Sequence, residues 1–339
     1  MKAVRFRGAG ELAVEICPDP VLHEGDALLE PLVAGVCGTD VHIVKGEYAS
    51  RPPVVLGHEI AGRVLEIRGS GSPVRVGDLV TVDPHRYCGV CEYCRRAMEH
   101  MCQRKEAYGV HLDGGMAELM AAPTKTLFPV ASDVTASVAA LAEPLACCIH
   151  GMDRLAPVSG LPILIFGCGA AGAMLIALAR HAGLRPVVVI DPNPAKRELA
   201  LVMGADVALD SNDADLAARS LATVPTDGYP YIIDAVGSTE VLTTALAVAG
   251  RGARILVFGV AAPEASLPVH PNQIYAKELT ILGSAINPFT HQRAVSLLTR
   301  LPLDALEMGF FDLDDAERAL AAVRLGAHDK VQLRVKREP

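Results

Sequence analysis

The chain has 339 residues, of which 51% are hydrophobic and 21% charged, enough to bury the cores of about two domains. This composition excludes a disordered chain, a collagen and a coiled coil. Only 4% of the residues are aromatic and none is Trp, which argues against a stacking surface for single-stranded nucleic acid. The net charge of −8 likewise argues against a polyanionic partner.

The first 150 residues are predicted to be rich in β-strands. Apolar or alternating runs occupy residues 27–36, 62–67 and 74–82, and a Gly-Ser-Gly turn at 69–71 separates the last two.

From about residue 155 the pattern changes to short apolar runs that alternate with helical segments. The predicted strands are 163–167, 187–191, 231–236, 254–259 and 279–283, with helices at 171–182 and 194–203 between the first of them. Later helices are expected at 290–299 and 314–325, followed by a last strand at 330–335. Alternating strands and helices predict a parallel sheet covered on both faces.

No segment resembles a targeting signal. Residues 1–10 lack the apolar centre of a secretory signal peptide. Residues 161–179 carry no charge and imitate a membrane span, but the three glycines among them suit a turn better than a lipid-facing helix. We therefore expect a cytoplasmic protein without a membrane partner.

A glycine motif, Gly167-x-Gly169-x-x-Gly172, follows the first apolar run of the second half and opens a helix at Ala170 and Ala171. Such glycines provide a tight turn, close approach of the backbone to a pyrophosphate, and close packing of helix on strand. The unpaired N–H groups of the helix N-terminus favour phosphate. The motif predicts a dinucleotide site.

An acidic residue, Asp191, ends the next apolar run nineteen positions after Gly172. Its carboxylate is suited to accept hydrogen bonds from the adenosine ribose and to repel a 2′-phosphate, which favours NAD over NADP. Arg197, six positions further along the chain, is a cation that could instead favour NADP. A flavodoxin-like turn, or a sheet that binds no nucleotide, is the alternative interpretation.

Four of the nine cysteines, Cys88, Cys91, Cys94 and Cys102, lie within fifteen residues. Four thiolates at this spacing are typical of a closed, tetrahedral structural zinc site in an exposed lobe at about residues 85–105. The alternatives are an iron–sulfur cluster, against which the seven-residue gap and the lack of a Pro after Cys102 argue, and four unmetallated thiols.

A second set of metal-binding residue types is dispersed: Cys37, His58, Glu59 and Glu143. No spacing rule connects these residues. Taken one at a time, each is most simply a buried thiol, a hydrogen-bonded histidine or a carboxylate without a metal.

Five motifs taken in order resemble the zinc-dependent medium-chain alcohol dehydrogenases. They are Cys37-Gly-Thr-Asp40, Gly57-His-Glu59, the four-cysteine lobe, Ala142-Glu-Pro-Leu-Ala146 and the Gly167 motif. The resemblance covers essentially the whole chain. It is greatest to the polyol branch (sorbitol, xylitol and arabinitol dehydrogenases), which has Glu-Pro-Leu where liver-type enzymes place a cysteine ligand.

The resemblance implies an α/β protein of two domains. A GroES-like, β-rich catalytic domain would comprise residues 1–153 and 286–339. A Rossmann domain with a doubly wound parallel sheet, residues 154–285, would bind NAD. The family also implies a homodimer or homotetramer, paired through the last strands of the cofactor sheet.

By the same resemblance, Cys37 and His58 match ligands of a catalytic zinc, and Glu143 occupies the fourth ligand position. Glu59 matches a carboxylate that binds zinc directly in some members and lies just outside the ligand shell in others. With the cysteine lobe, this implies two Zn²⁺ per chain. A mixed sulfur, nitrogen and oxygen set with one exchangeable member is what a catalytic zinc requires.

Thr39 matches the hydroxyl that takes the proton of the alcohol, and His42 could pass that proton to solvent. The implied reaction moves a hydride from a secondary alcohol to NAD, because a zinc ion lowers the pKa of the alcohol.

Ile286 and Asn287 stand where sorbitol-type members carry an Arg-Tyr pair in the polyol pocket, so the substrate is predicted to be another polyol or a cyclitol. An L-threonine or simple secondary-alcohol dehydrogenase is the enzymatic alternative. A non-catalytic protein that binds NAD and zinc is the third.

Overall fold

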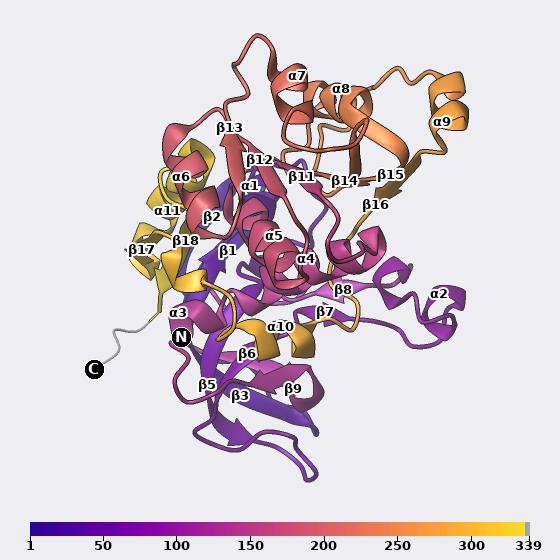
Figure 1. The fold of residues 1–339 in the computed structure, drawn as a ribbon. Helices are drawn as coiled ribbons and strands as arrows, with labels where there is room; N and C mark the ends of the chain where they lie inside the picture. Colours follow the sequence, from indigo (N-terminus) through magenta and orange to yellow (C-terminus); the bar gives the residue numbers. More distant parts are fainter. Residues whose placement is uncertain (336–339) are drawn as a thin grey trace. The chain divides into compact units, whose positions relative to one another are not determined.

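The computed structural model describes residues 1–335, which divide into two compact units (Figure 1). The first unit comprises Met1–Pro144, Pro288–Thr299 and the residues from Leu306 onward. The second comprises Leu145–Asn287 and Arg300–Ala305. This division differs from the predicted boundary after residue 153, because helix α4 (Ala142–Leu155) begins in one unit and continues in the other. Because this boundary lies inside a continuous helix, no change in amino-acid composition marks it in the sequence.

The second unit is built on a six-stranded, wholly parallel sheet in the order β13-β12-β11-β14-β15-β16. Its strands are β11 (Ile163–Phe166), β12 (Val187–Ile190), β13 (Val207–Leu209), β14 (Tyr229–Asp234), β15 (Ala249–Val257) and β16 (Thr280–Gly283). Its helices are α5 (Ala170–His181), α6 (Pro194–Val202), α7 (Leu216–Leu221), α8 (Thr239–Val248) and α9 (Pro271–Lys277). The predicted doubly wound parallel sheet is confirmed, and its order reverses between β11 and β14, where such sheets bind ligands.

Burial explains why the short apolar runs become strands. Every residue of β11 and β12 is buried, as expected for strands covered on both faces. Helix α5 packs against β11 and β12, and α8 packs against β14 and β15. The edge strand β16 is different, because the Ile281 side chain on it is 43% exposed. Strand β13 was not predicted, since three residues are too few to show a periodic pattern.

The uncharged segment 161–179 divides between β11 and α5. Within residues 1–335, no helix has the length and apolar character needed to cross a membrane.

The first unit contains a seven-stranded sheet in the order β10-β6-β5-β3-β18-β17, with β9 also paired to β3. Its strands are β3 (Asp26–Val36), β5 (Glu59–Ile67), β6 (Leu79–Val82), β9 (Met120–Pro123), β10 (Leu127–Pro129), β17 (Met308–Asp312) and β18 (Lys330–Arg334). A smaller sheet joins β2 (Glu11–Ile16), β1 (Lys2–Gly8) and β4 (Val54–Val55), and β7 (His85–Arg86) pairs with β8 (Glu106–Ala107). The predicted strand 74–82 is thus confirmed only in part. Its first half is a turn, in which the Asp78 side chain accepts a hydrogen bond from the Arg75 N–H at 2.8 Å.

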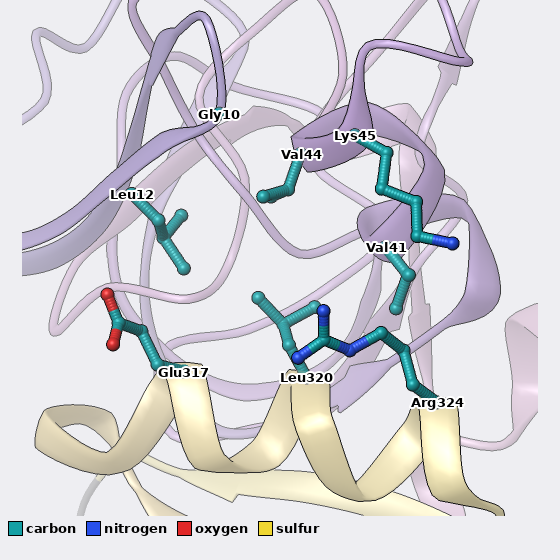
Figure 2. A pocket seen from close by; sticks show the side chains of 8 residues that line it. All are labelled: Gly10, Leu12, Val41, Val44, Lys45, Glu317, Leu320 and Arg324. Atoms are coloured by element: carbon teal, nitrogen blue, oxygen red, sulfur yellow. The ribbon is translucent and has the colours of Figure 1, made fainter.

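The helices of the first unit are short. They are α1 (Gly38–Lys45), α2 (Glu92–Arg95), α3 (Ala136–Ala139), α10 (His291–Leu297) and α11 (Ala316–Leu325), beside short 3₁₀ helices at 99–101, 124–126 and 313–315. Helix α1 packs on α11, and Val41, Ile43 and Leu320 belong to the apolar core that they share with β3 and β18. A small pocket of about 200 Å³ remains beside this contact, where Leu12, Val44 and Leu320 point toward one another (Figure 2).

A candidate metal centre and a candidate dinucleotide site

The first candidate site begins at the junction of β3 and α1. Cys37 is the N-cap of α1, and the Asp40 carboxylate accepts a hydrogen bond from the Cys37 N–H at 2.8 Å. A carboxylate at this position satisfies an N–H group that the helix itself cannot. The chain therefore turns sharply after β3 and holds the Cys37 thiol at the helix start.

Strand β5 brings two further ligand types to the same place. It runs antiparallel to β3 with Gly35 opposite Glu59, so His58 and Glu59 arrive beside Cys37. The Cys37 sulfur, a His58 ring nitrogen and a Glu59 oxygen all lie within 4.8 Å of one another, and His58 and Glu59 are buried. This sulfur, nitrogen and oxygen set fits Zn²⁺. The structure thus brings together three residues that no sequence spacing connects.

The Asp40 carboxylate faces the Nδ1 side of the His58 ring. The carboxylate is fully buried, and its second oxygen lies 3.5 Å from Nδ1 of His58. Burial has the largest single effect and lowers the pKa of His58, but the charges and hydrogen bonds of Asp40 and Cys37 together raise it by more, so that the pKa lies well above its usual value. A carboxylate behind one ring nitrogen orients the other toward a metal. The sequence does not indicate this role of Asp40, because only the fold shows that its carboxylate faces His58.

Glu59 forms a buried ion pair with Lys330, which no sequence motif indicates. Nζ of Lys330 donates to Oε1 of Glu59 at 2.7 Å, although the two residues are 271 positions apart. Both side chains are buried, with exposed fractions of 7% and 1%. Burial has the largest single effect and lowers the pKa of Lys330, but the charges of Glu59, Cys37 and Glu143 and the hydrogen bond to Glu59 together raise it above its usual value, so the lysine stays a cation. No local pattern distinguishes Lys330 from the other lysines of the chain.

Glu143 lies in the first turn of α4 and is also buried. It is not one of the three residues whose ligand atoms lie within 4.8 Å of one another. Its charge nevertheless acts on Lys330, as do the charges of Glu59 and Cys37. Three of the four predicted ligands thus form one group, and the fourth is electrostatically linked to it through Lys330.

The two predicted proton-transfer residues lie on α1. Oγ1 of Thr39 is 3.7 Å from the Cys37 sulfur, and the Thr39 side chain is partly exposed. His42, one turn further along, is exposed, and its Nδ1 lies 2.6 Å from a Glu47 oxygen. Residues three apart on a helix are neighbours, so the placement is compatible with a relay from Thr39 to solvent.

The four cysteines of the lobe form a second candidate metal centre around α2. Their sulfurs all lie within 4.8 Å of one another. Individual separations are 3.9 Å for Cys88 and Cys94, 3.5 Å for Cys91 and Cys94, and 3.8 Å for Cys91 and Cys102. A tetrahedron with Zn–S bonds of about 2.3 Å has edges of about 3.8 Å. The cluster therefore fits one metal ion, whereas the separate irons of a larger cluster would hold the sulfurs further apart.

The thiols of this lobe also differ in acidity. Hydrogen bonds, of which that from the Val90 N–H has the largest effect, lower the pKa of Cys88 to about 6. Removal from water and the neighbouring thiols raise the pKa of Cys94 to about 12. Four thiols this close do not all ionise without a cation among them, which is the condition that zinc supplies.

The glycine motif lies at the carboxyl end of β11, where the strand order reverses. Gly167 has a φ of +90°, and a Cβ on Gly172 would overlap the Gly167 carbonyl, so both positions require glycine. Apart from Gly169 itself and its two chain neighbours, no atom of residues 1–335 lies within 4 Å of the position that a Cβ on Gly169 would take. Helix α5, with Ala170 and Ala171 in its first turn, starts at this open position, as a pyrophosphate site requires.

Asp191 follows β12 directly and is buried. Its oxygens accept hydrogen bonds from the N–H groups of Cys168 and Asn193, each at 2.8 Å, which ties the carboxylate to the glycine turn. Arg197 donates to the carbonyl of Asp191 at 2.9 Å and pairs with Asp210 at 3.1 Å. Arg197, which could favour a 2′-phosphate, therefore already has other partners.

Asn287 and Ile286 lie at the end of the second unit's long segment. Asn287 is fully buried, and neither of its side-chain amide atoms has a hydrogen-bond partner among residues 1–335. Ile286 has a φ of +51°, an unusual conformation for a β-branched residue. Strain beside an unpaired buried amide is typical of ligand-binding segments.

Two family models match the chain. The model for the alcohol dehydrogenase GroES-like domain matches residues 23–132, and the model for zinc-binding dehydrogenases matches residues 170–300. Together they cover more than half of the chain.

Among curated proteins, L-threonine 3-dehydrogenase of Streptomyces coelicolor is 32% identical, over 93% of this chain and 94% of its own length. D-altritol 5-dehydrogenase of Agrobacterium fabrum is 30% identical, over 96% of this chain and all of its own length. A solved structure described as a zinc-binding dehydrogenase from Sinorhizobium meliloti 1021, bound to NADP, is 31% identical with a TM-score of 0.92 and covers 98% of both chains. The predicted fold class and family are confirmed: the chain belongs to the zinc-dependent medium-chain alcohol and polyol dehydrogenases and is an oxidoreductase.

Proposed function

We propose that the protein oxidises a secondary alcohol of a polyol or cyclitol to a ketone with NAD as hydride acceptor. The observation that carries this proposal is the buried set of Cys37, His58 and Glu59, with ligand atoms within 4.8 Å of one another and with Asp40 behind the histidine. A non-catalytic NAD- and zinc-binding protein would have no need of this set.

Cys37 and His58 would hold the proposed catalytic zinc, and Glu143 would take the fourth ligand position, with Glu59 close by. When bound, the ion supplies a Lewis acid that makes an alcohol easier to deprotonate. Asp40 holds the imidazole of His58 in orientation, and Thr39 receives the proton of the alcohol and passes it toward His42. A second zinc, held by the four cysteines of the lobe, has a structural role.

Asn287 and the relatives support this substrate class. A buried amide with unpaired N–H and C=O groups is suited to bind a hydroxyl of the substrate. The D-altritol relative favours a polyol, and the L-threonine relatives make a threonine dehydrogenase the second candidate. The test measures NADH formation from a panel of polyols, cyclitols, L-threonine and 2-butanol, with metal analysis of the same sample. We expect turnover of a polyol or cyclitol and about two zinc ions per chain; turnover of L-threonine alone would favour the second candidate.

Cofactor preference is expected to depend on Asp191. Asp191→Ser removes acceptors for the ribose hydroxyls, so the KM for NAD should rise. It also removes the charge that repels a 2′-phosphate, so the preference for NAD over NADP should become smaller. Steady-state kinetics with both cofactors measures this. A wild-type protein that prefers NADP, which is the ligand of the Sinorhizobium structure, would contradict the assignment.

We propose a homodimer or homotetramer that pairs through β16. This edge strand is mostly exposed and carries Ile281 and Leu282, and pairing with a second copy would cover its free edge. Light scattering at micromolar concentration should give at least twice the chain mass, and Ile281→Lys should lower it. A wild-type monomer would refute this.

A further inference from the structure

The small pocket beside the contact of α1 and α11 is lined by three segments of the first unit (Figure 2). Leu12 comes from the β1–β2 hairpin, Val41 and Val44 from α1, and Leu320 from α11. Side chains three apart on a helix are neighbours, so α1 turns an apolar face to the pocket. The volume of about 200 Å³ is that of about seven water molecules, which suits a short aliphatic chain rather than a nucleotide.

Charged side chains of opposite sign stand at the two ends of this apolar surface. Glu317, Leu320 and Arg324 lie on one face of α11, at spacings of three and then four residues. The Glu317 carboxylate lies on the side of Leu12, and the Arg324 guanidinium bends back beside Leu320 (Figure 2). Lys45, the last residue of α1, adds a second cation to the lining. The pocket therefore has an anionic end, an apolar middle and a cationic end.

The fold itself does not use these charges. Within residues 1–335, the side chains of Glu317, Arg324 and Lys45 form no hydrogen bond and no ion pair. Arg318, which follows Glu317 but does not line this pocket, instead pairs with Asp315 at 2.9 Å. Opposite charges held apart over an apolar surface complement a zwitterion that carries an apolar chain.

The spacing of the two charged residues sets the size of such a ligand. Seven residues of helix separate the Cα atoms of Glu317 and Arg324 by about 10 Å. An α-amino acid that makes a hydrogen bond of about 2.8 Å at each end covers most of this distance, and the two side chains cover the rest.

We propose that this pocket binds a free α-amino acid with a branched aliphatic side chain, such as L-leucine. The carboxylate of the amino acid binds the guanidinium of Arg324, whose paired N–H donors match it, and its ammonium binds Glu317. Its side chain covers the apolar surface of Leu12, Val44 and Leu320. The inference does not depend on the proposed function, since the lining residues belong to neither metal centre and not to the glycine motif.

The test is isothermal titration calorimetry of the full chain with L-leucine, for which we expect one saturable site per chain. Two analogues each lack one charge: 4-methylpentanoate has no ammonium, and isopentylamine has no carboxylate. Each should bind at least about 10-fold more weakly than L-leucine, the usual effect of losing a hydrogen bond to a charged group. The melting temperature should rise with the concentration of L-leucine, because the ligand binds only the folded chain.

Each charged residue should account for the difference from one analogue. In Glu317→Gln, L-leucine should bind no more tightly than 4-methylpentanoate, because the partner of its ammonium is lost. In Arg324→Met, it should bind no more tightly than isopentylamine. Both residues are exposed, so these variants are expected to fold. Val44→Phe fills the pocket and should abolish binding, whereas Arg318→Met removes a cation of α11 outside the pocket and should bind as the wild type does.

Three results would overturn the inference. The first is a wild-type chain without saturable binding of L-leucine, and the second is equal affinity for L-leucine and both analogues. The third is wild-type affinity in Glu317→Gln and Arg324→Met. Cys37→Ser separates this pocket from the candidate metal centre, because it should bind L-leucine as the wild type does. Loss of binding in Cys37→Ser, with binding retained in Arg324→Met, would place the amino acid at the metal centre and also refute the proposed site.

Discussion

A Cys37→Ser variant is expected to keep its fold and one of two zinc ions but to lose turnover. Serine is a good N-cap, so α1 can still begin at this position, while the thiolate ligand is lost. Cys91→Ser is expected to do the opposite. It should lose the lobe metal and lower the melting temperature, because a structural zinc contributes folding free energy directly. Metal analysis, thermal unfolding and kinetics of both variants check this.

Cys17→Ser is the matched control. Cys17 is buried in the same unit but belongs to neither cluster, so this variant should keep both zinc ions and its activity. The assignment of the two sites would be reversed if Cys37→Ser unfolded the protein while Cys91→Ser remained active.

Thr39→Val should lower kcat by about 10²–10⁴-fold, the usual contribution of a group that moves a proton. Valine keeps the shape of threonine and removes the hydroxyl, so the KM for NAD should change little. Thr39→Ser, which keeps the hydroxyl, should retain most of the activity. The measurement is steady-state kinetics of the three proteins from pH 6 to 10.

His42→Ala should cost less than Thr39→Val, because water can replace an exposed histidine at the outer end of a relay. The activity that His42→Ala loses should be partly restored at higher pH. A Thr39→Val variant that turns over at nearly the wild-type rate would show that the proton leaves by another route, with Glu59 as the first residue to examine.

Most strands of the second unit could be predicted from the sequence, although β13 and the helices α7, α8 and α9 were missed. The first unit could be predicted only in part, mainly in its last elements α10, α11 and β18. Strands β11 and β12 are continuous apolar runs, and the glycine turn between β11 and α5 has a pattern of its own, so local sequence was sufficient there. The first unit depends on pairings between distant segments, such as β3 with β18, which no periodicity shows.

The candidate metal sites, too, could be predicted only where their residues lie close together in the sequence. The four cysteines lie close in sequence, and their spacing alone predicted a metal. Cys37, His58 and Glu59 were found only because the motifs resembled a known family. Lys330 belongs to no such motif, and its importance follows only from the fold, which buries it against Glu59. Gly35 could not be singled out for the same reason. A Cβ at this position would overlap the Glu59 carboxylate, but no sequence pattern indicates this.

The position of β18 in the chain has a consequence for the order of events during synthesis. The ribosome releases β3, with Cys37 at its end, long before β18, and the whole inserted second unit is made in between. Until β18 arrives, β3 lacks one neighbouring strand and Glu59 lacks its cation. The nascent first unit therefore carries an incomplete metal centre beside an open sheet edge, at which strands of other chains can pair. The inserted unit has no such delay, since its own sheet is complete before β17 is made. The newly made protein should thus be most prone to aggregation and mismetallation while the final segments are still being translated.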